Sequence, residues 1–275
     1  MSQKKETTLQ SATLEDLKRS DFVISVGNSL KNDNMPLKLA LYYALTNNKS
    51  YISSIYPIEE KDSSNLLSLF IKNEVGSEEA ALAMIANIFV DDKSDQEEFF
   101  DALDIGYLSA ESNISEEELD IIKTNYIGKQ KPVLVVGEDT LNHPRAKNIV
   151  KIARYIEENT PFKVLMIPMD RRKFSYKTDE KIDAVEELGE FNGSVVYSVS
   201  ALEKEELIGS AQFALCSKIR SGDNVKFSID GVEYIRHFKI DKYMKGTIAY
   251  NQIFCMDVKS SAYRYNQVKI EVINE

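Results

Sequence analysis

The feature that most constrains the fold is a strand, turn and helix pattern near the N-terminus. Residues 22–26 (FVISV) form a short, largely apolar run, which is typical of a strand covered on both faces. The run leads into Gly27, Asn28 and Ser29. Pro36 then suits the first position of a helix with apolar residues at helical spacing. Because α/β proteins form ligand sites at the carboxyl ends of their strands, the three residues of the turn are a candidate site.

Alternating strands and helices continue to about residue 200, and this order predicts a parallel sheet with flanking helices. A short capped helix is expected to start at Thr13. Ser77 is a candidate N-cap followed by two glutamates, and Ser115 with Glu118 forms a capping box. Residues 180–188 also favour a helix. The strands expected in this region are residues 51–58, 66–71, 131–137, 163–168 and 194–200.

Beyond residue 200 the pattern changes to short segments in which apolar and polar residues alternate. Residues 221–223 (SGD) and 230–231 (DG) are turn signals, and the second is typical of a β-hairpin. We therefore expect a polar leader over residues 1–12, an α/β domain over residues 13–200, and a smaller, mainly β, barrel-like domain over residues 201–275. The strands expected in the last part are residues 213–217, 224–229, 232–240, 247–250 and 267–273.

Charge and composition argue against several classes of function. The chain carries 34 basic and 44 acidic residues, a formal net charge of −10, whereas nucleic-acid binders need a basic face. No apolar run approaches the roughly 18 to 20 residues that span a bilayer, and the polar N-terminus lacks an apolar signal segment. Two cysteines fit a reducing compartment. We expect a cytoplasmic protein that neither binds nucleic acid nor inserts into a membrane.

The candidate site at Gly27, Asn28 and Ser29 has two interpretations. Backbone N–H groups of this turn could hold a phosphate at the start of the following helix. Alternatively, glycine and asparagine serve only to give the backbone the freedom that a strand-to-helix turn needs. The segment lacks the G-x-G-x-x-G spacing of dinucleotide-binding loops, and this favours the simple turn.

The other candidate residues favour structural roles. Gly137 ends a strand, but Glu138 and Asp139 follow it, and their charges would repel a phosphate. The two histidines and two cysteines lack partners at metal-ligand spacing. We therefore predict no catalytic residue and no metal site, structural or surface histidines, and cysteines that pack as small buried hydrophobic residues. These residues are His143, His237, Cys216 and Cys255.

Four weak motifs, in this order, resemble the molybdopterin oxidoreductase superfamily. In that superfamily a strand ending in glycine and asparagine leads into a loop and a helix that begins at proline, matched here by Ser20-Asp21, residues 23–29 and Met35-Pro36. Residues 75–82 (VGSEEAAL) resemble a second motif of the superfamily, in which a glycine leads into a helix that begins with an acidic residue and alanines. Two further motifs follow in the same order as in that superfamily. They are the strand at residues 131–137 and the Gly222-Asp223 turn with the strand after it. The chain is most similar to the C-terminal part of the large iron–sulphur subunit of bacterial NADH–quinone oxidoreductase.

The resemblance implies a subunit without a redox centre of its own. The acid and arginine with which that superfamily grips its pterin cofactor are absent from the matching residues, 54–58 (SIYPI). Two cysteines cannot hold a four-iron cluster, which takes four thiolates. By resemblance, we expect a non-catalytic, cofactor-less module of the peripheral arm of respiratory complex I. It would be cytoplasmic, and peripheral to the inner membrane through other subunits of the oxidoreductase.

Two alternatives remain open at this point. The chain could be part of a split molybdopterin-dependent oxidoreductase whose catalytic half lies on another polypeptide. It could instead be a small α/β enzyme that binds a nucleotide at Gly27–Ser29. Bound molybdenum or tungsten would favour the first alternative, and nucleotide binding by the isolated chain would favour the second.

Overall fold

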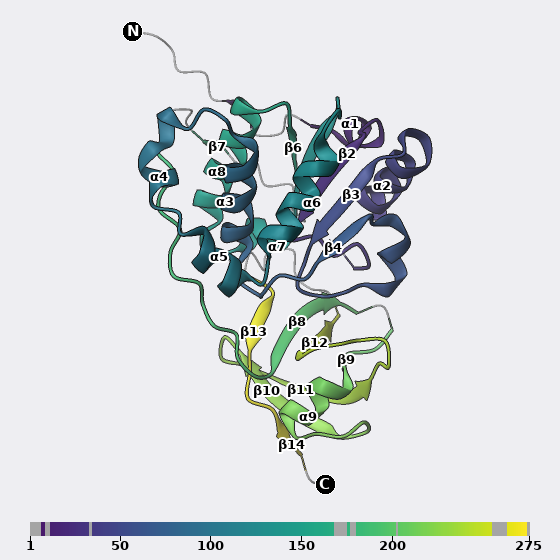
Figure 1. The fold of residues 1–275 in the computed structure, drawn as a ribbon. Helices are drawn as coiled ribbons and strands as arrows, with labels where there is room; N and C mark the ends of the chain where they lie inside the picture. The colour runs from purple at the N-terminus through teal and green to yellow at the C-terminus, as the bar shows by residue number, and fades with distance from the viewer. Residues whose placement is uncertain are drawn as a thin grey trace. The chain divides into compact units, whose positions relative to one another are not determined.

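A computed structural model describes residues 7–8, 12–32, 35–167, 175–176, 180–201, 203–254 and 263–273. The chain divides into two compact units. The first comprises residues 1–57 and 62–189, and the second comprises residues 58–61 and 190–275. Figure 1 labels most of the elements of both units. The expected leader, residues 1–12, lies mostly outside the described residues, as does Cys255.

The first unit is built on a parallel sheet of five strands, in the order β4-β3-β2-β5-β6 (Figure 1). The predicted parallel sheet with flanking helices is thus confirmed. The first strand of the sheet in the chain, β2, is central, and the later strands are added on its two sides. The strands are β2 (Phe22–Val26), β3 (Tyr51–Ile55), β4 (Leu69–Ile71), β5 (Pro132–Val136) and β6 (Lys163–Met166).

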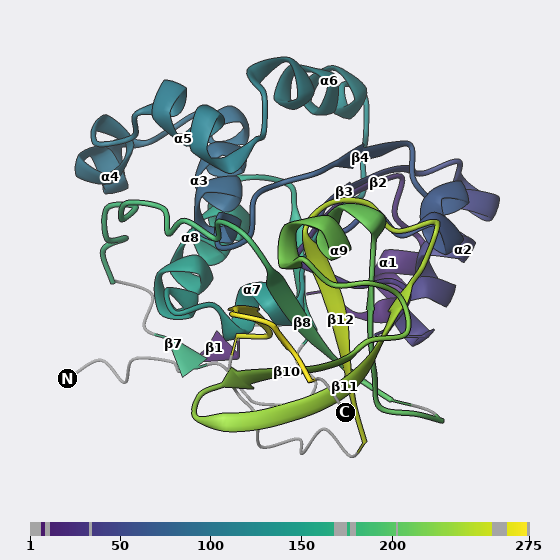
Figure 2. The same cartoon turned by 90° about the horizontal axis from the view of Figure 1, so that it is seen from below.

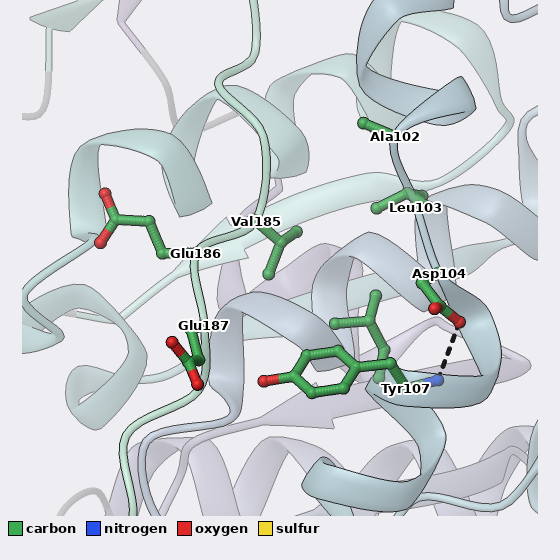
Figure 3. Close-up of a pocket in the computed structure, with 8 residues that line it drawn as sticks. Ala102, Leu103, Asp104, Tyr107, Val185, Glu186 and Glu187 are labelled. Atoms are coloured by element: carbon green, nitrogen blue, oxygen red, sulfur yellow. Dashed lines mark hydrogen bonds between the residues drawn. The ribbon is translucent and has the colours of Figure 1, made fainter.

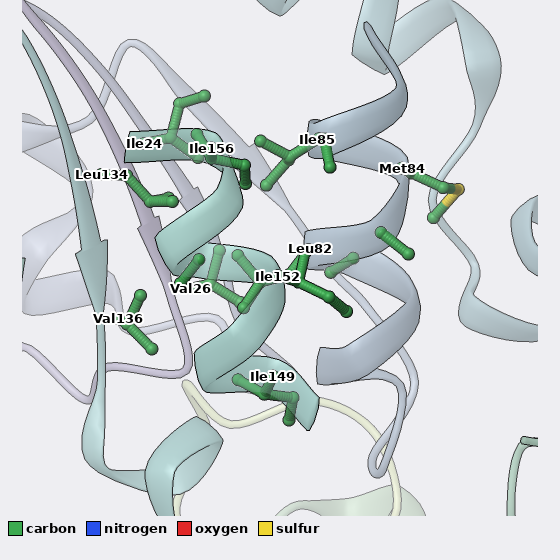
Figure 4. Packing of buried hydrophobic residues seen from close by; sticks show 14 of the residues in the cluster. Ile24, Val26, Leu82, Met84, Ile85, Leu134, Val136, Ile149, Ile152 and Ile156 are labelled. Carbon is green, nitrogen blue, oxygen red and sulfur yellow. The ribbon is translucent and has the colours of Figure 1, made fainter. Parts of the chain in front are cut away.

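Two hydrophobic layers cover the sheet. Alternate residues of β2 face opposite layers: Ile24 packs with α3, α6 and α8, and Val23 packs with α1 and α2. Figure 4 shows the larger layer, where Ile85 of α3 and Ile156 of α8 meet Ile24. The helices are α1 (Leu14–Lys18), α2 (Met35–Asn48), α3 (Glu78–Phe89), α6 (Glu116–Tyr126) and α8 (Ala146–Asn159).

Smaller elements complete this unit. A short antiparallel pair joins β1 (Thr7–Thr8) to β7 (Ser175–Tyr176). The remaining helical segments are η1 (Lys61–Leu66), η2 (Ser94–Gln96), α4 (Glu97–Asp101), α5 (Ile105–Ser112) and α7 (Glu138–Asn142).

Local signals placed most of these helices correctly. The Thr13 hydroxyl accepts a hydrogen bond from the Asp16 backbone N–H, which caps α1. The predicted Ser115–Glu118 capping box is present at the start of α6. Ser77 precedes α3 as expected, but the predicted side-chain cap is wrong. Its hydroxyl donates to the Glu74 carbonyl, at 2.7 Å, and does not cap the helix.

Residues 180–188 do not form the expected helix. They run as an irregular segment whose backbone groups bond to side chains of other elements. The Asp183 N–H donates to Asn148 Oδ1 at 2.8 Å, and Asn148 Nδ2 donates to the Asp183 carbonyl at 2.8 Å. The Leu188 N–H donates to the Tyr107 hydroxyl. These tertiary bonds satisfy backbone groups that a helix would otherwise have paired.

The second unit contains a curled, mixed sheet of seven strands, in the order β13-β8-β12-β9-β11-β10-β14. Its core includes Val196, Leu207, Phe213 and Phe238. The strands are β8 (Val195–Ser200), β9 (Glu206–Gly209), β10 (Asn224–Ile229), β11 (Val232–Ile240), β12 (Ile248–Ile253), β13 (Tyr265–Gln267) and β14 (Glu271–Val272).

The hairpin expected at residues 230–231 is confirmed. It joins β10 to β11, with Ile229 opposite Val232 (Figure 2). Asp230 has φ +50° and Gly231 has φ +80°, and a two-residue turn with both φ angles positive matches the twist of the flanking strands.

Two expected strands are corrected in this unit. Residues 194–200 do not complete the first sheet, because β8 pairs with β12 and β13 in the seven-stranded sheet. Residues 213–217 lie in a helix, α9 (Ala211–Ser217), and not in a strand. The Ser210 hydroxyl caps α9 by accepting from the Phe213 N–H, at 2.9 Å. A short apolar run cannot distinguish a buried strand from one face of a short helix.

Candidate functional site

The strand order identifies one place where a ligand site is expected on physical grounds. From β2 the chain adds strands on one side and then returns to add β5 and β6 on the other. In open α/β sheets, ligands bind in the crevice at the carboxyl ends of the two strands where this reversal occurs. The residues after β2 are Gly27, Asn28 and Ser29, and those after β5 are residues 137–140. The structure therefore brings the predicted site next to the start of α7.

The two turns fill this crevice by contacting each other. Gly27 has φ +67°, and a Cβ atom added there would lie 2.0 Å from Oγ1 of Thr140. A Cβ added to Gly137 would lie 2.1 Å from the Gly27 carbonyl oxygen. The Thr140 hydroxyl donates to the Val26 carbonyl at 3.1 Å, and the Gly137 N–H donates to the same oxygen at 2.8 Å. Both glycines are therefore required by close backbone packing.

The polar side chains of the predicted site bond within their own turn. Asn28 Nδ2 donates to Ser25 Oγ at 2.8 Å and to the Val26 carbonyl at 3.2 Å. The Ser29 hydroxyl accepts from the backbone and side-chain nitrogens of Asn32, both at 3.1 Å. Asn28 and Ser29 are buried. These bonds shape the connection between β2 and α2.

A buried polar network, which sequence reasoning missed, lies at the N-terminal end of α3. Glu79 is 2% exposed and accepts from Arg145 Nε at 3.2 Å and from Asn148 Nδ2 at 2.7 Å. Arg145 also donates to Glu186 at 2.7 Å and to the Ala184 carbonyl at 2.9 Å. The network joins α3, α8 and the irregular segment before residue 189. The sequence signal for it is the position of Glu79, three and four residues before apolar positions of the buried helix face.

His143 follows α7 and has a structural role. Its Nδ1 accepts from the Arg145 N–H at 3.0 Å, so Nε2 carries the proton and donates to the Gly76 carbonyl at 3.1 Å. The Glu78 carboxylate lies 3.9 Å from Nε2. Burial lowers the pKa of His143, outweighing the Gly76 bond and the charge of Glu79, both of which raise it. The imidazole is therefore held neutral.

The lowered pKa of His143 predicts a pH-dependent stability. The folded protein binds this proton less readily than the unfolded chain, whose histidine pKa is about 6.5. The free energy of unfolding should therefore fall as pH drops below about 6.5, towards the folded-state pKa. His143→Gln keeps a donor for Gly76 and removes this titration. Between pH 7.5 and about 5.5 its melting temperature should fall less than that of wild type.

The control is His237→Gln, because His237 is an exposed residue of β11. This variant should follow the wild-type pH profile. Equal losses of melting temperature for wild type and His143→Gln would contradict the assignment of the effect to His143.

A shallow pocket of about 280 Å³ lies between α5 and the irregular segment (Figure 3). The ring of Tyr107 extends from α5 towards the residues around Glu187, and the Asp104 carboxylate caps α5 by accepting from the Tyr107 N–H at 3.0 Å. The pocket is lined by apolar side chains and by three acidic residues, whose negative charges would repel a phosphate ligand. The lining residues are Ala102, Leu103, Asp104, Tyr107, Leu108, Val185, Glu186 and Glu187.

The remaining candidate residues lie apart from these sites. Cys216 is exposed on α9, so its predicted burial is wrong. His237 lies in β11 of the second unit. Among the residues that the structure describes, no group of three or more histidine, cysteine, aspartate or glutamate side chains could hold a metal ion. In the same part of the chain, no helix is long and apolar enough to cross a membrane.

No family model matches the chain, and no curated protein matches it significantly.

Proposed function

We propose that this chain is a non-catalytic, cofactor-less subunit or module of the peripheral arm of a respiratory NADH–quinone oxidoreductase. It would hold neighbouring subunits in place on the cytoplasmic side, while electrons pass through iron–sulphur clusters in other chains. The order of its sequence motifs, which resembles the large iron–sulphur subunit of that complex, supports the family part of the proposal.

One observation carries the non-catalytic part of the proposal. At the reversal of strand order, where an α/β enzyme of this topology would bind its ligand, Thr140 packs against Gly27 and Gly137 packs against Asn28. The backbone carbonyls of Val26 and Gly27 accept hydrogen bonds from the turn after β5. These contacts occupy the crevice with the chain's own atoms, and they stabilise the join between the two halves of the sheet.

The proposal is tested by affinity purification from the native cell, with mass spectrometry of the partners and metal analysis of the same sample. We expect subunits of an NADH–quinone oxidoreductase to co-purify. The separately purified chain should be colourless and should contain no stoichiometric iron, molybdenum or tungsten.

Two outcomes would replace the proposal with a different function. Molybdenum or tungsten bound to a complex of this chain with a second polypeptide would indicate a split molybdopterin enzyme. A rise in melting temperature with a nucleotide, abolished in a Gly27→Ala protein that still folds, would indicate a nucleotide-binding enzyme.

A further inference from the structure

Helix α2 is apolar on two opposite faces. One face packs under the sheet and is fully buried; it carries Leu37, Ala40, Leu41 and Ala44. The opposite face is exposed to solvent, and its large apolar side chains follow one another at spacings of four, three and one residues along the helix. These side chains are Met35 (76% exposed), Leu39 (51%), Tyr42 (50%) and Tyr43 (40%). We call these four residues the outer stripe of α2.

The four residues of the outer stripe belong to neither hydrophobic cluster that covers the sheet. A helix that covers a sheet normally carries polar residues on its outward face, and single exposed apolar residues need no explanation. The other large apolar side chains that are exposed in the described part of this unit lie on other segments; they are Tyr107, Ile121 and Ile127. Four on consecutive turns of one helix form a continuous surface, which indicates a binding site for another molecule.

The segment that carries the stripe has a net positive charge, opposite in sign to that of the whole chain. Residues 30–51 contain three lysines and one aspartate, whereas the whole chain has a net charge of −10. Lys38 borders the stripe on one side of the helix: at about 100° per residue it lies next to Tyr42 around the helix axis and far from Tyr43. On the other side, the Lys18 ammonium lies 5.9 Å from the centre of the Tyr43 ring, but it is already paired with the Glu15 carboxylate. No acidic residue occurs in α2.

These features favour a helix as the bound element. At 1.5 Å per residue, the stripe extends about 12 Å along α2, from Met35 to Tyr43. It offers side chains, because the backbone groups of α2 are used within the helix and cannot pair with an added strand. An amphipathic helix can lay its own apolar face along such a surface.

We propose that the outer stripe of α2 binds an amphipathic helix of a partner subunit, with acidic residues along the edges of its apolar face. Those carboxylates would lie beside Lys38, whose Nζ bonds only to the Asp62 backbone carbonyl, at 3.5 Å, among the described residues. The proposal rests on the proposed function in one respect, that the partner is another subunit of the oxidoreductase. A second copy of this chain fits less well, since it would place Lys38 against its own equivalent. An anionic membrane surface would be repelled by the net charge of −10.

The contact is tested by photo-cross-linking in the native cell. A benzophenone amino acid replaces Leu39 in the full chain, and a matched protein carries it at Ile121, an exposed apolar position of α6 (44% exposed). Position 39 should cross-link to one segment of another subunit, and mass spectrometry should show that this segment is amphipathic with acidic edges. Cross-links to a second copy, to lipid, or no more than at position 121 would overturn the proposal.

Substitutions measure the strength of the contact. Leu39→Asp places a charge in the centre of the stripe and should reduce retention of the partner subunit by about tenfold or more. Lys38→Glu should also weaken retention, and this loss should shrink in high salt because added ions screen the repulsion. Ile121→Asp is the matched control and should retain the partner. Thermal melts of all three variants establish that they fold.

The same experiment separates the two proposals. If the wild-type chain retains no oxidoreductase subunit, the proposed function fails. If wild type and Leu39→Asp retain those subunits equally, the proposed function stands and the role of α2 is refuted.

Discussion

Alanine at Gly27 is expected to destabilise the protein by roughly 3 kcal/mol or more, because two costs add. The backbone there has φ +67°, which costs an L-residue about 1–2 kcal/mol. In addition, the new methyl group would lie 2.0 Å from Thr140 Oγ1, and overpacking of this kind costs about 1–3 kcal/mol. Urea unfolding of the variant and of wild type gives the difference in the free energy of unfolding.

Alanine substitutions at two other glycines measure the backbone cost and the packing cost separately. Gly137 has an ordinary φ of −86°, but a Cβ atom would lie 2.1 Å from the Gly27 carbonyl oxygen, so Gly137→Ala should show the packing cost alone. Gly128 has φ +80°, and a methyl group added there would meet no atom within 4 Å, so Gly128→Ala should show the backbone cost alone. If Gly27→Ala cost no more than Gly128→Ala, the close contact between the two turns would be refuted.

Arg145→Met is expected to cost about 3 kcal/mol, the lower end of the range for removing one partner of a buried ion pair, because Arg145 is itself 23% exposed. Glu79 is 2% exposed, and the substitution would leave its carboxylate without the guanidinium that lies 3.2 Å away. The carbonyl of Ala184 would lose a donor as well. The cost should be measured by urea unfolding at pH 7, where the carboxylate of the unfolded chain is ionised.

Two controls test the cause of this loss. Glu186 also bonds to Arg145, but its side chain is 67% exposed, so Glu186→Gln should cost less than about 1 kcal/mol. The double variant Arg145→Met/Glu79→Leu removes both charges of the pair and should be more stable than Arg145→Met alone. A double variant less stable than the single one would show that loss of packing, and not the stranded charge, dominates.

The sequence was most informative where local chemistry determines local structure. The apolar runs of β2 and β5 and the capping box at Ser115 depend on neighbouring residues, and each was predicted at its place. The turn at Asp230-Gly231 was also predicted from neighbouring residues alone, because the Asp-Gly pair is favoured in hairpin turns that need positive φ at both positions.

The sequence-based predictions were wrong where contacts with residues far away in the sequence determine the local structure or the sheet to which a strand belongs. The β8 run is equally suitable for either sheet, and its pairing with β12, about fifty residues later, assigns it to the second. Residues 180–188 have a helical pattern, but bonds to Asn148 override it. For the candidate site, the sequence named Gly27–Ser29, but only the structure shows that Thr140 lies against them. No spacing rule connects residues more than a hundred positions apart.

The central position of β2 also affects the order in which the chain can fold during synthesis. The edge of β2 that pairs with β3 is matched within about thirty residues, whereas its other edge pairs with β5, about 110 residues later. Until residue 136 has been made, that second edge has no strand to pair with, and unpaired strand edges promote aggregation. Asp21 helps to close the gap: its carboxylate accepts from the N–H groups of Gln130 and Lys131, both at 2.9 Å. The residue just before the central strand thus aligns the segment that leads into β5, the strand that pairs with the second edge of β2.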